Sequence, residues 1–211
     1  MRGYPVSARD VVVIDSGGAN LASLQFALQR LGEKAEVTTD ASRIRAASHV
    51  LLPGVGAAHD AMTRLRGSGL DEVIPQLTQP LLGICLGMQL LFDASEEAPP
   101  GAHETRGLGV VPGRVARMPA AAGRPVPHMG WNQLQPLGTD ALFDGIDAGE
   151  YVYFVHSYAA PVVPDTLATS EYGGHFTAAV KRGNFRGVQF HPERSATVGA
   201  RLLANFIALR S

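Results

Sequence analysis

The chain of 211 residues is long enough for one domain with a sizeable core and too short for two ordinary domains. Its 18 lysines and arginines balance 19 aspartates and glutamates, and no window holds the basic run that nucleic acid or an acidic membrane surface would require. The first ten residues lack the apolar stretch of a signal peptide, and the longest apolar runs are strand-sized. We expect a cytoplasmic protein without nucleic-acid or membrane partners, with a flexible extension over residues 1–9 and a single domain over residues 10–211.

The first half of the chain alternates strand-like and helix-like segments. Residues 11–14 are β-branched and continuously apolar, which is typical of a buried parallel strand. Apolar residues then recur at spacings of three, four and three before Gly32, as expected for a helix on a sheet: Leu21, Leu24, Leu28 and Leu31. A strand over 35–38, a helix near 42–47 and a strand over 49–52 continue the alternation. This rhythm predicts a doubly wound α/β sheet.

The second half begins in the same way and then changes character. A strand over 80–84 and a helix over 88–92 are followed by an exposed loop at 98–102. Strand-like runs come next, over 110–118, 151–158, 167–171, 176–181 and 185–190. A helix closes the chain, with one apolar face formed by Val198, Leu202, Phe206 and Leu209. We therefore predict an α/β fold with a mixed, mainly parallel sheet flanked by helices and an added antiparallel layer.

Cys85 is the only cysteine, so the fold cannot depend on an internal disulfide. It lies in Gly83-Ile84-Cys85-Leu86-Gly87, between a predicted strand and a predicted helix, where this spacing forms a nucleophile elbow. The elbow would expose the sulfur at the carboxyl edge of the sheet, and the following helix would favour its thiolate form. The backbone N–H of Leu86 would point toward a developing oxyanion. The alternative is an inert buried cysteine whose flanking glycines serve packing.

A second group of reactive residues is His191-Pro192-Glu193, directly after an apolar run. Residues two apart share a side of an extended backbone, so the Glu193 carboxylate can orient the His191 ring while the other ring nitrogen faces Cys85. Pro192 fixes φ and stiffens the pair. The sequence thus predicts a Cys85–His191–Glu193 triad. An ordinary turn with a surface histidine and glutamate is the alternative.

The segment Pro53-Gly54-Val55-Gly56 ends a different predicted strand and can bring a second backbone N–H to the oxyanion, from Val55 or Gly56. A loop that only needs flexibility is the alternative. Residues 15–20 lack the spacing and the lysine of phosphate-binding loops, and the seven histidines lack zinc-site spacings. We expect neither a metal nor another cofactor.

The elbow, read as Gly83 to Gln89, and the late His191-Pro192-Glu193 together resemble the class I glutamine amidotransferases, from about Val11 to the end of the chain. The resemblance implies that Cys85 attacks the carboxamide of L-glutamine and forms a glutamyl thioester while ammonia leaves. It also implies a glutamine site formed by Gly56, Gln89, Glu97, Ser157 and Tyr158.

Three further segments are similar to one branch of this family, in which a glutaminase subunit of histidine biosynthesis works beside a separate (β/α)8-barrel synthase subunit. They are 53–57, 127–132 and 153–158. The resemblance implies that the barrel subunit receives the ammonia, and that the interface or ammonia gate includes Asn20, Met129, Trp131, Tyr153 and Arg194. Arg194 stands where the family commonly has lysine, Ala58 where it has phenylalanine, and the loop at 99–106 is longer than usual.

Two alternatives to this interpretation stay open on sequence grounds. Another class I amidotransferase could supply a different synthase, although 127–132 and 153–158 argue against it. A binding subunit could keep the fold without catalysis, although the complete triad argues against that.

Overall fold

The computed structural model describes residues 9–17, 21–136 and 138–210. Its main sheet has eight strands, of which five are parallel, in the order β2 (Ala35–Thr38), β1 (Val11–Ile14), β3 (His49–Gly54), β4 (Leu81–Cys85) and β14 (Phe185–Val188). Three antiparallel strands extend it: β13 (His175–Arg182), β12 (Thr166–Glu171) and β9 (Gln135–Pro136). The predicted mixed, mainly parallel sheet is confirmed.

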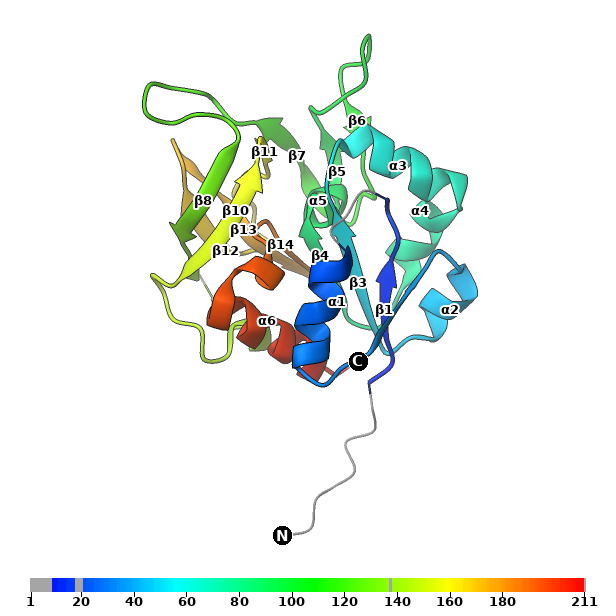
Figure 1. The fold of residues 1–211 in the computed structure, drawn as a ribbon. Coiled ribbons are helices and arrows are strands. Elements are labelled where there is room, and N and C mark those ends of the chain that lie inside the picture. Colours follow the sequence, from blue (N-terminus) through cyan, green and yellow to red (C-terminus); the bar gives the residue numbers. More distant parts are fainter. Residues whose placement is uncertain (1–8, 18–20, 137, 211) are drawn as a thin grey trace.

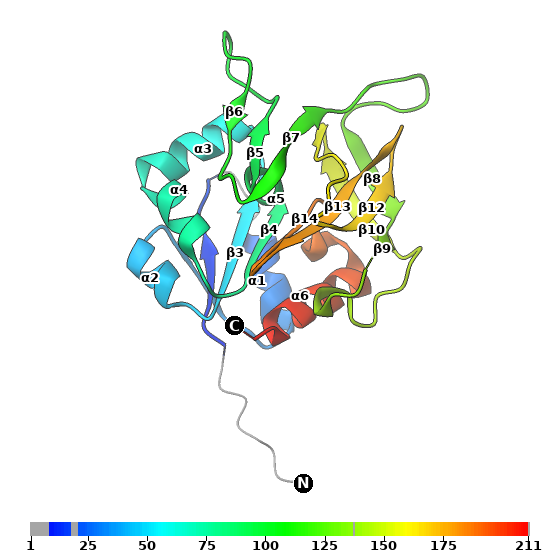
Figure 2. The same ribbon diagram turned by 180° about the vertical axis from the view of Figure 1, so that it is seen from behind.

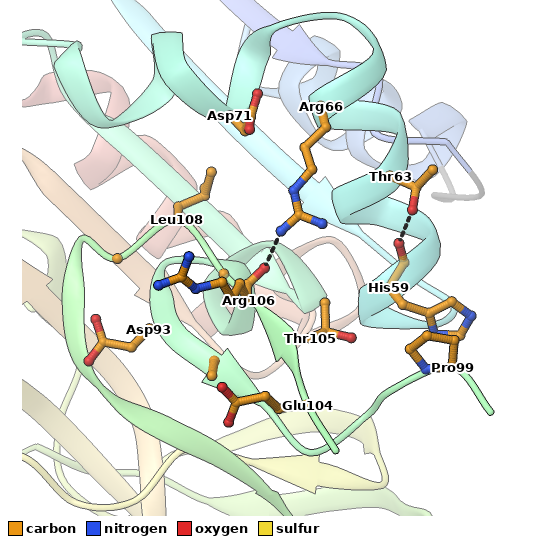
Figure 3. Close-up of a pocket in the computed structure, with 13 residues that line it drawn as sticks. His59, Thr63, Arg66, Asp71, Asp93, Pro99, Glu104, Thr105, Arg106 and Leu108 are labelled. Carbon is orange, nitrogen blue, oxygen red and sulfur yellow. Dashed lines mark hydrogen bonds between the residues drawn. The ribbon is translucent and has the colours of Figure 1, made fainter. Parts of the chain in front are cut away.

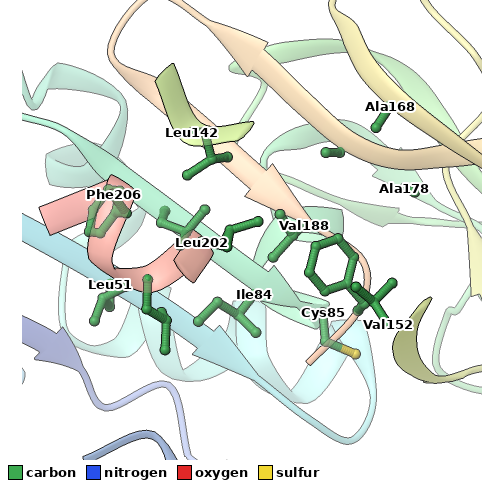
Figure 4. Close-up of a cluster of buried hydrophobic side chains, with 14 of the residues drawn as sticks. Leu51, Ile84, Cys85, Leu142, Val152, Ala168, Ala178, Val188, Leu202 and Phe206 are labelled. Atoms are coloured by element: carbon green, nitrogen blue, oxygen red, sulfur yellow. The ribbon is translucent and has the colours of Figure 1, made fainter. Parts of the chain in front are cut away.

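Helices cover both faces of the main sheet (Figure 1, Figure 2). The first face carries α1 (Leu21–Arg30) and α6 (Ala196–Ala208). The second face carries α2 (Ala41–Ala46), α3 (Ala58–Gly67) and α4 (Leu70–Val73). A turn of 3-10 helix, η1 (Ile74–Gln76), follows α4. Because successive strand residues point to opposite faces, Leu51 of β3 packs in the first core and Leu52 in the second. Figure 4 shows the first core, to which Cys85 belongs.

The strands of the predicted antiparallel layer are divided between the main sheet, which contains β12, β13 and β14, and two smaller sheets, one antiparallel and one mixed. One pairs β8 (His128–Gln133) with β10 (Tyr151–His156), and the other has the order β11 (Tyr158–Ala159), β7 (Val111–Arg117), β5 (Phe92–Ser95) and β6 (Thr105–Arg106). Figure 1 shows β8 and β10 beside the carboxyl half of the main sheet. A single turn of 3-10 helix, η2 (Ala141–Phe143), precedes β10.

Most predicted elements differ from the structure by one or two residues at their ends; the strand expected over 185–190, for example, ends at Val188. Two differences follow from hydrogen bonding. The helix expected over 88–92 is α5 (Leu86–Leu90), and Phe92 already begins β5, because the carbonyls of Leu90 and Phe92 accept hydrogen bonds from the 107–109 turn. The strand expected over 151–158 is interrupted at Ser157, because β10 pairs with β8 whereas β11 pairs with β7. Residues 1–8 of the expected extension, and Asn20, lie outside the described residues.

Within the described ranges, no helix is both long and apolar enough to cross a membrane. The carboxyl ends of β3, β4 and β14 meet at one edge of the main sheet, since Gly54 lies opposite Cys85 and Val188 opposite Ile84. Ligands of open α/β sheets bind at this edge, and the residues that the sequence singled out follow these three strand ends.

Candidate active site

Cys85 occupies a sharp turn between β4 and α5, with φ of 54° and ψ of −112°. A non-glycine residue in this backbone region is uncommon and marks local strain at functional sites. The turn requires its flanking glycines: a Cβ on Gly87 would lie 1.7 Å from the Leu52 carbonyl oxygen, and one on Gly83 would lie 2.7 Å from that of Gly87. The glycines therefore allow the close approach that holds the sulfur at the sheet edge.

His191 and Glu193 form a buried hydrogen-bonded pair. The Nδ1–Oε1 distance is 2.8 Å, and the side chains are 8 % and 6 % exposed. Burial alone would lower the pKa of His191, but its contacts with Cys85 and Glu193 outweigh burial and raise that pKa to about 10. Nε2, the nitrogen left for Cys85, has no hydrogen-bond partner of ordinary geometry among the described residues. The neighbouring Cys85 sulfur nevertheless contributes to the raised pKa of His191. An imidazolium at this position favours a thiolate.

The backbone around the pair is held by Ser195, which is fully buried. Its hydroxyl donates to the His191 carbonyl at 2.7 Å and accepts from the Tyr153 N–H at 3.0 Å. The His191 N–H donates in turn to the Tyr153 carbonyl at 2.9 Å. These bonds fasten the 3-10 turn η3 (Pro192–Arg194), and with it Glu193, to β10.

A cavity of about 320 Å³ opens beside the sulfur, at the small end of the range for ligand pockets. It brings together every residue that the sequence assigned to the oxyanion hole or to glutamine: Val55, Gly56, Leu86, Gln89, Glu97, Ser157 and Tyr158. Its other lining residues are Cys85, Pro127, Val155, His156 and His191. Segments far apart in the chain thus converge on one small site, and its size suits an amino acid.

The loop after β3 reaches the elbow closely. Gly54 is buried, and a Cβ there would lie 2.9 Å from the Gly87 nitrogen, so no larger residue fits. Gly56 has φ of 90° and open space around it. The loop is therefore fixed at Gly54 and free at Gly56, which suits a backbone donor that faces the cavity.

Two of the expected glutamine contacts already have partners inside the protein. One Glu97 carboxylate oxygen accepts from the Ala58 N–H at the start of α3, at 2.8 Å. The Gln89 amide nitrogen donates to the Tyr158 carbonyl and to the Gln189 side-chain oxygen, both at 2.8 Å. Gln89 therefore offers its side-chain oxygen to the cavity, and Glu97 its second carboxylate oxygen.

Sequence reasoning missed Gln189, whose amide nitrogen lies 3.7 Å from the Cys85 sulfur and whose side chain is fully buried. The signal was present: Gln189 precedes His191 by two residues, and the alternation that paired His191 with Glu193 also places Gln189 on that side.

A buried chain of imidazoles was also missed. His156 bonds the Tyr158 carbonyl through Nδ1 at 2.8 Å and His128 through Nε2 at 3.0 Å, while Asn132 approaches the other His128 nitrogen at 3.3 Å. Burial lowers the pKa of both histidines to about 4. They are neutral at pH 7 and hold the cavity wall at Tyr158 against β8.

Three of the expected interface residues, Met129, Trp131 and Tyr153, lie on the β8–β10 sheet, and Arg194 of η3 packs on this face. Met129 is 63 % and Trp131 52 % exposed. Trp131 meets Tyr153 edge to face at 6.0 Å between ring centroids, and the Arg194 guanidinium lies 4.4 Å above the Tyr153 ring. This apolar face therefore continues to the backbone that carries His191.

A larger cavity of about 1010 Å³ lies between α3 and the 99–109 segment and is lined by side chains of both charges (Figure 3). Arg66 spans it and donates to the Arg106 carbonyl at 2.9 Å. None of the residues that the sequence assigned to catalysis or to glutamine lines it. Among the described residues, no group of three or more histidine, cysteine, aspartate or glutamate side chains is arranged to hold a metal.

Comparison with known proteins agrees with this geometry. The sequence pattern of the family described as glutamine amidotransferase class-I matches residues 12–209. The chain belongs to this family. An imidazole glycerol phosphate synthase subunit HisH from Xanthomonas campestris pv. campestris (strain 8004) is 54 % identical over 200 residues, which cover 95 % of this chain and 98 % of that protein. The same subunit from Shewanella oneidensis is 49 % identical over 213 residues, covering 95 % and 96 %.

Solved structures of glutamine amidotransferases share the fold. A crystal structure of one such enzyme has a TM-score of 0.70 at 22 % identity and covers 93 % of this chain and 96 % of that one. A glutamine amidotransferase from Thermotoga maritima has a TM-score of 0.59 at 19 % identity, covering 93 % and 81 %. At these identities the likeness concerns the fold alone.

Proposed function

We propose that this chain is the glutaminase subunit of an imidazole glycerol phosphate synthase and hydrolyses L-glutamine to glutamate and ammonia. The observation that carries the proposal is the buried His191–Glu193 pair, 2.8 Å apart, beside Cys85 on a strained strand-to-helix turn, with His191 and Cys85 lining the same cavity. Relatives named as subunits of that synthase, about half identical over 95 % of the chain, support the choice within the family.

In the proposed reaction His191 takes the Cys85 proton, and the sulfur attacks the carboxamide carbon of glutamine. The oxyanion is stabilised by the Leu86 N–H and by a second N–H from Val55 or Gly56, since all three residues line the cavity. The C–N bond then breaks while His191 returns its proton to the leaving nitrogen, which departs as ammonia.

The glutamyl thioester on Cys85 is then hydrolysed. His191 removes a proton from a water molecule, the oxygen attacks the thioester carbon, and the C–S bond breaks to give glutamate and restore the sulfur. Glu193 holds the ring through Nδ1 in the orientation that both half-reactions use. No metal or other cofactor takes part in this scheme.

Glutamine is held by the polar groups that face the cavity. The Gln89 side-chain oxygen and the free Glu97 carboxylate oxygen can accept from an α-ammonium group, while Gly56, Ser157 and Tyr158 line the remaining wall. An ammonium between a carboxylate and an amide oxygen distinguishes glutamine from simple amides.

The partner in this proposal is a separate (β/α)8-barrel synthase subunit that uses the ammonia. Ammonia released into neutral water becomes ammonium, which is not a nucleophile, so transfer must take place inside the complex. The exposed face with Met129, Trp131, Tyr153 and Arg194 adjoins the active site through Val155, whose carbonyl lies 3.8 Å from the sulfur. We place the docking surface here and the complex in the cytoplasm, and we expect one amidotransferase domain over residues 10–211.

The test measures glutamate release from glutamine by the chain alone, with a barrel synthase subunit, and with that subunit plus its nucleotide substrate, beside a Cys85→Ala control. Release that is highest in the full mixture and absent in the control is the expected result. Release without any effect of the barrel subunit would refute the partner, and no release in any mixture would refute the proposed activity.

A further inference from the structure

Gln189 is a fully buried amide placed between the cavity wall and the reacting sulfur. It follows β14 directly, and the proposed mechanism does not use it. Its oxygen accepts from Gln89 at 2.8 Å, and its nitrogen lies 3.7 Å from the Cys85 sulfur. A buried amide with both ends engaged is held in one position.

The direction of the Gln189 amide is fixed by its neighbour. The Gln89 nitrogen has two N–H groups, and it donates one to the Tyr158 carbonyl and one to Gln189. If the Gln189 amide were turned over, its N–H groups would meet those of Gln89, and its oxygen would face the sulfur. Only the observed direction satisfies both amides, so an N–H of Gln189 points at Cys85.

The sulfur therefore lies between an acceptor and a donor. A neutral Cys85 thiol can donate to the Val155 carbonyl at 3.8 Å, but a thiolate cannot. The Gln189 N–H can donate to either form and binds the anion more strongly, because hydrogen bonds to charged acceptors are the stronger ones. The contact thus favours the form of Cys85 that attacks.

We propose that Gln189 contacts the reacting sulfur directly, donates a hydrogen bond that stabilises and aims the Cys85 thiolate, and links it through Gln89 to the glutamine-binding wall at Tyr158. This inference rests on the proposed function for its purpose, but the contact itself is a property of the free chain. Packing alone is the competing explanation, because a buried amide also joins β14 to α5.

Two variants distinguish the effect of the hydrogen bond that Gln189 donates from the effect of its packing. Gln189→Glu keeps the shape and the acceptor for Gln89 and replaces the N–H that faces the sulfur by an oxygen. Gln189→Met keeps the length and removes both hydrogen bonds. Gln79→Met is the matched control: Gln79 is also buried, and its amide donates to the Ile44 carbonyl at 2.8 Å, but it does not line the active-site cavity.

The measurement is the rate of Cys85 alkylation by iodoacetamide across pH 6 to 9 in the full-length chain, followed by mass spectrometry, with the thermal midpoint of each variant. We expect Gln189→Met to react roughly tenfold more slowly at neutral pH, the effect of one hydrogen bond to a charged group. In Gln189→Glu the rise of the rate should be shifted to higher pH, with slower alkylation at neutral pH, because a carboxylate repels the thiolate. Gln79→Met should lower the thermal midpoint only.

Alkylation profiles of both Gln189 variants that coincide with the wild-type profile would overturn the inference and leave a packing role. If Gln189→Met fails to fold, the shape-preserving Gln189→Glu decides alone. Alkylation requires neither glutamine nor a partner. A chain that releases no glutamate but shows the Gln189 effect would therefore refute the proposed function and leave the contact standing.

Discussion

At the scale of single residues, the active site depends on charges that face one another at short range inside the protein. The His191 imidazole lies between a carboxylate and a sulfur, whereas burial dominates the environment of His156 and His128. The pKa of the His191 imidazole is therefore raised, whereas that of the His156 imidazole, which lines the same cavity, is lowered. Environment, and not residue type, assigns the role.

Replacement of Cys85 by alanine should lower the pKa of His191, because one of the two groups that favour the protonated ring is lost. An NMR titration of the imidazole resonances in wild-type and Cys85→Ala protein measures the change. His128 and His49, whose pKa values are lowered mainly by burial, serve as internal references. Identical His191 titrations in both proteins would show that Cys85 does not raise the pKa of His191.

The triad was predictable from sequence because both of its parts are local. A Gly-x-Cys-x-Gly turn and a His-x-Glu pair fix their geometry within a few residues. Gln89 and Glu97 were assigned from family resemblance alone, and the structure adds their contacts with Tyr158 and Ala58. Those contacts depend on how α3 and β11 pack, which no local pattern encodes.

At the level of secondary structure, the sharp turn at Cys85 can form because β3, β4 and α5 approach one another too closely for any residue with a Cβ at the contact positions. Gly87 faces the Leu52 carbonyl, and Gly54 faces the Gly87 nitrogen. The predicted strand ends fall within about two residues of the observed ones, because apolar β-branched runs and glycines coincide there. Helix α3 was not predicted: its buried residues Ala58, Ala61, Met62 and Leu65 have helical spacing, but half of them are alanines and the apolar signal is weak.

Gly87→Ala should remove activity and lower the free energy of unfolding by about 2–3 kcal/mol, because its Cβ would lie 1.7 Å from the Leu52 oxygen and the backbone must shift. Urea denaturation and Cys85 alkylation measure the two effects. Gly67→Ala in α3 is the matched control, since a Cβ there has no neighbour within 4 Å. Equal stability of Gly87→Ala and wild type would disprove the close approach.

The two buried histidines behind β10 should make the fold sensitive to mild acid. Their folded pKa values of about 4 lie below the unfolded value of 6.5, so the unfolded chain binds protons first as the pH falls. Stability is then fully present above about pH 6.5 and decreases as the pH falls toward 4, with a slope of up to about 1.4 kcal/mol per pH unit for each histidine. His49, with a lowered pKa, adds to this loss.

Urea denaturation at pH 7, 6, 5 and 4 tests this window. Burial alone would raise the pKa of Asp140, but its contacts with Arg186 and Lys181 lower that pKa to about 2. Its contribution to the free energy of unfolding is therefore lost only below about pH 4. The histidine and carboxylate effects are therefore separate in pH. A constant free energy of unfolding from pH 7 to pH 5 would show that the histidines are not buried as described.

At the scale of the whole molecule, the doubly wound order of the sheet followed from the alternation of strands and helices in the first half of the chain. The distribution of the later strands over three sheets could not be predicted from the sequence, because antiparallel strands of similar length can pair in several orders. Cross-strand pairs such as Tyr153 with Trp131 decide which side chains face solvent. The exposure of Met129 and Trp131 is thus a result of tertiary pairing.

Trp131→Ala should weaken binding to a barrel synthase subunit by roughly tenfold or more, as expected for a central exposed aromatic residue of an interface. It should leave the thermal midpoint of the free chain nearly unchanged, because the side chain is half exposed. Calorimetric titration gives the affinity, and Phe26→Ala on α1, another exposed aromatic residue, is the control. Equal affinities of the Trp131 variant and wild type would show that Trp131 is not part of the interface.

The central claim is that the Cys85 sulfur attacks glutamine and carries its acyl group. The most direct measurement is rapid acid quenching of the complex during turnover, followed by mass spectrometry of the peptide that contains Cys85. A glutamyl adduct on Cys85 is expected during turnover of the wild-type complex and is expected to be absent from Cys85→Ala. Glutamate release without any adduct on that peptide, or release that persists in Cys85→Ala, would contradict it.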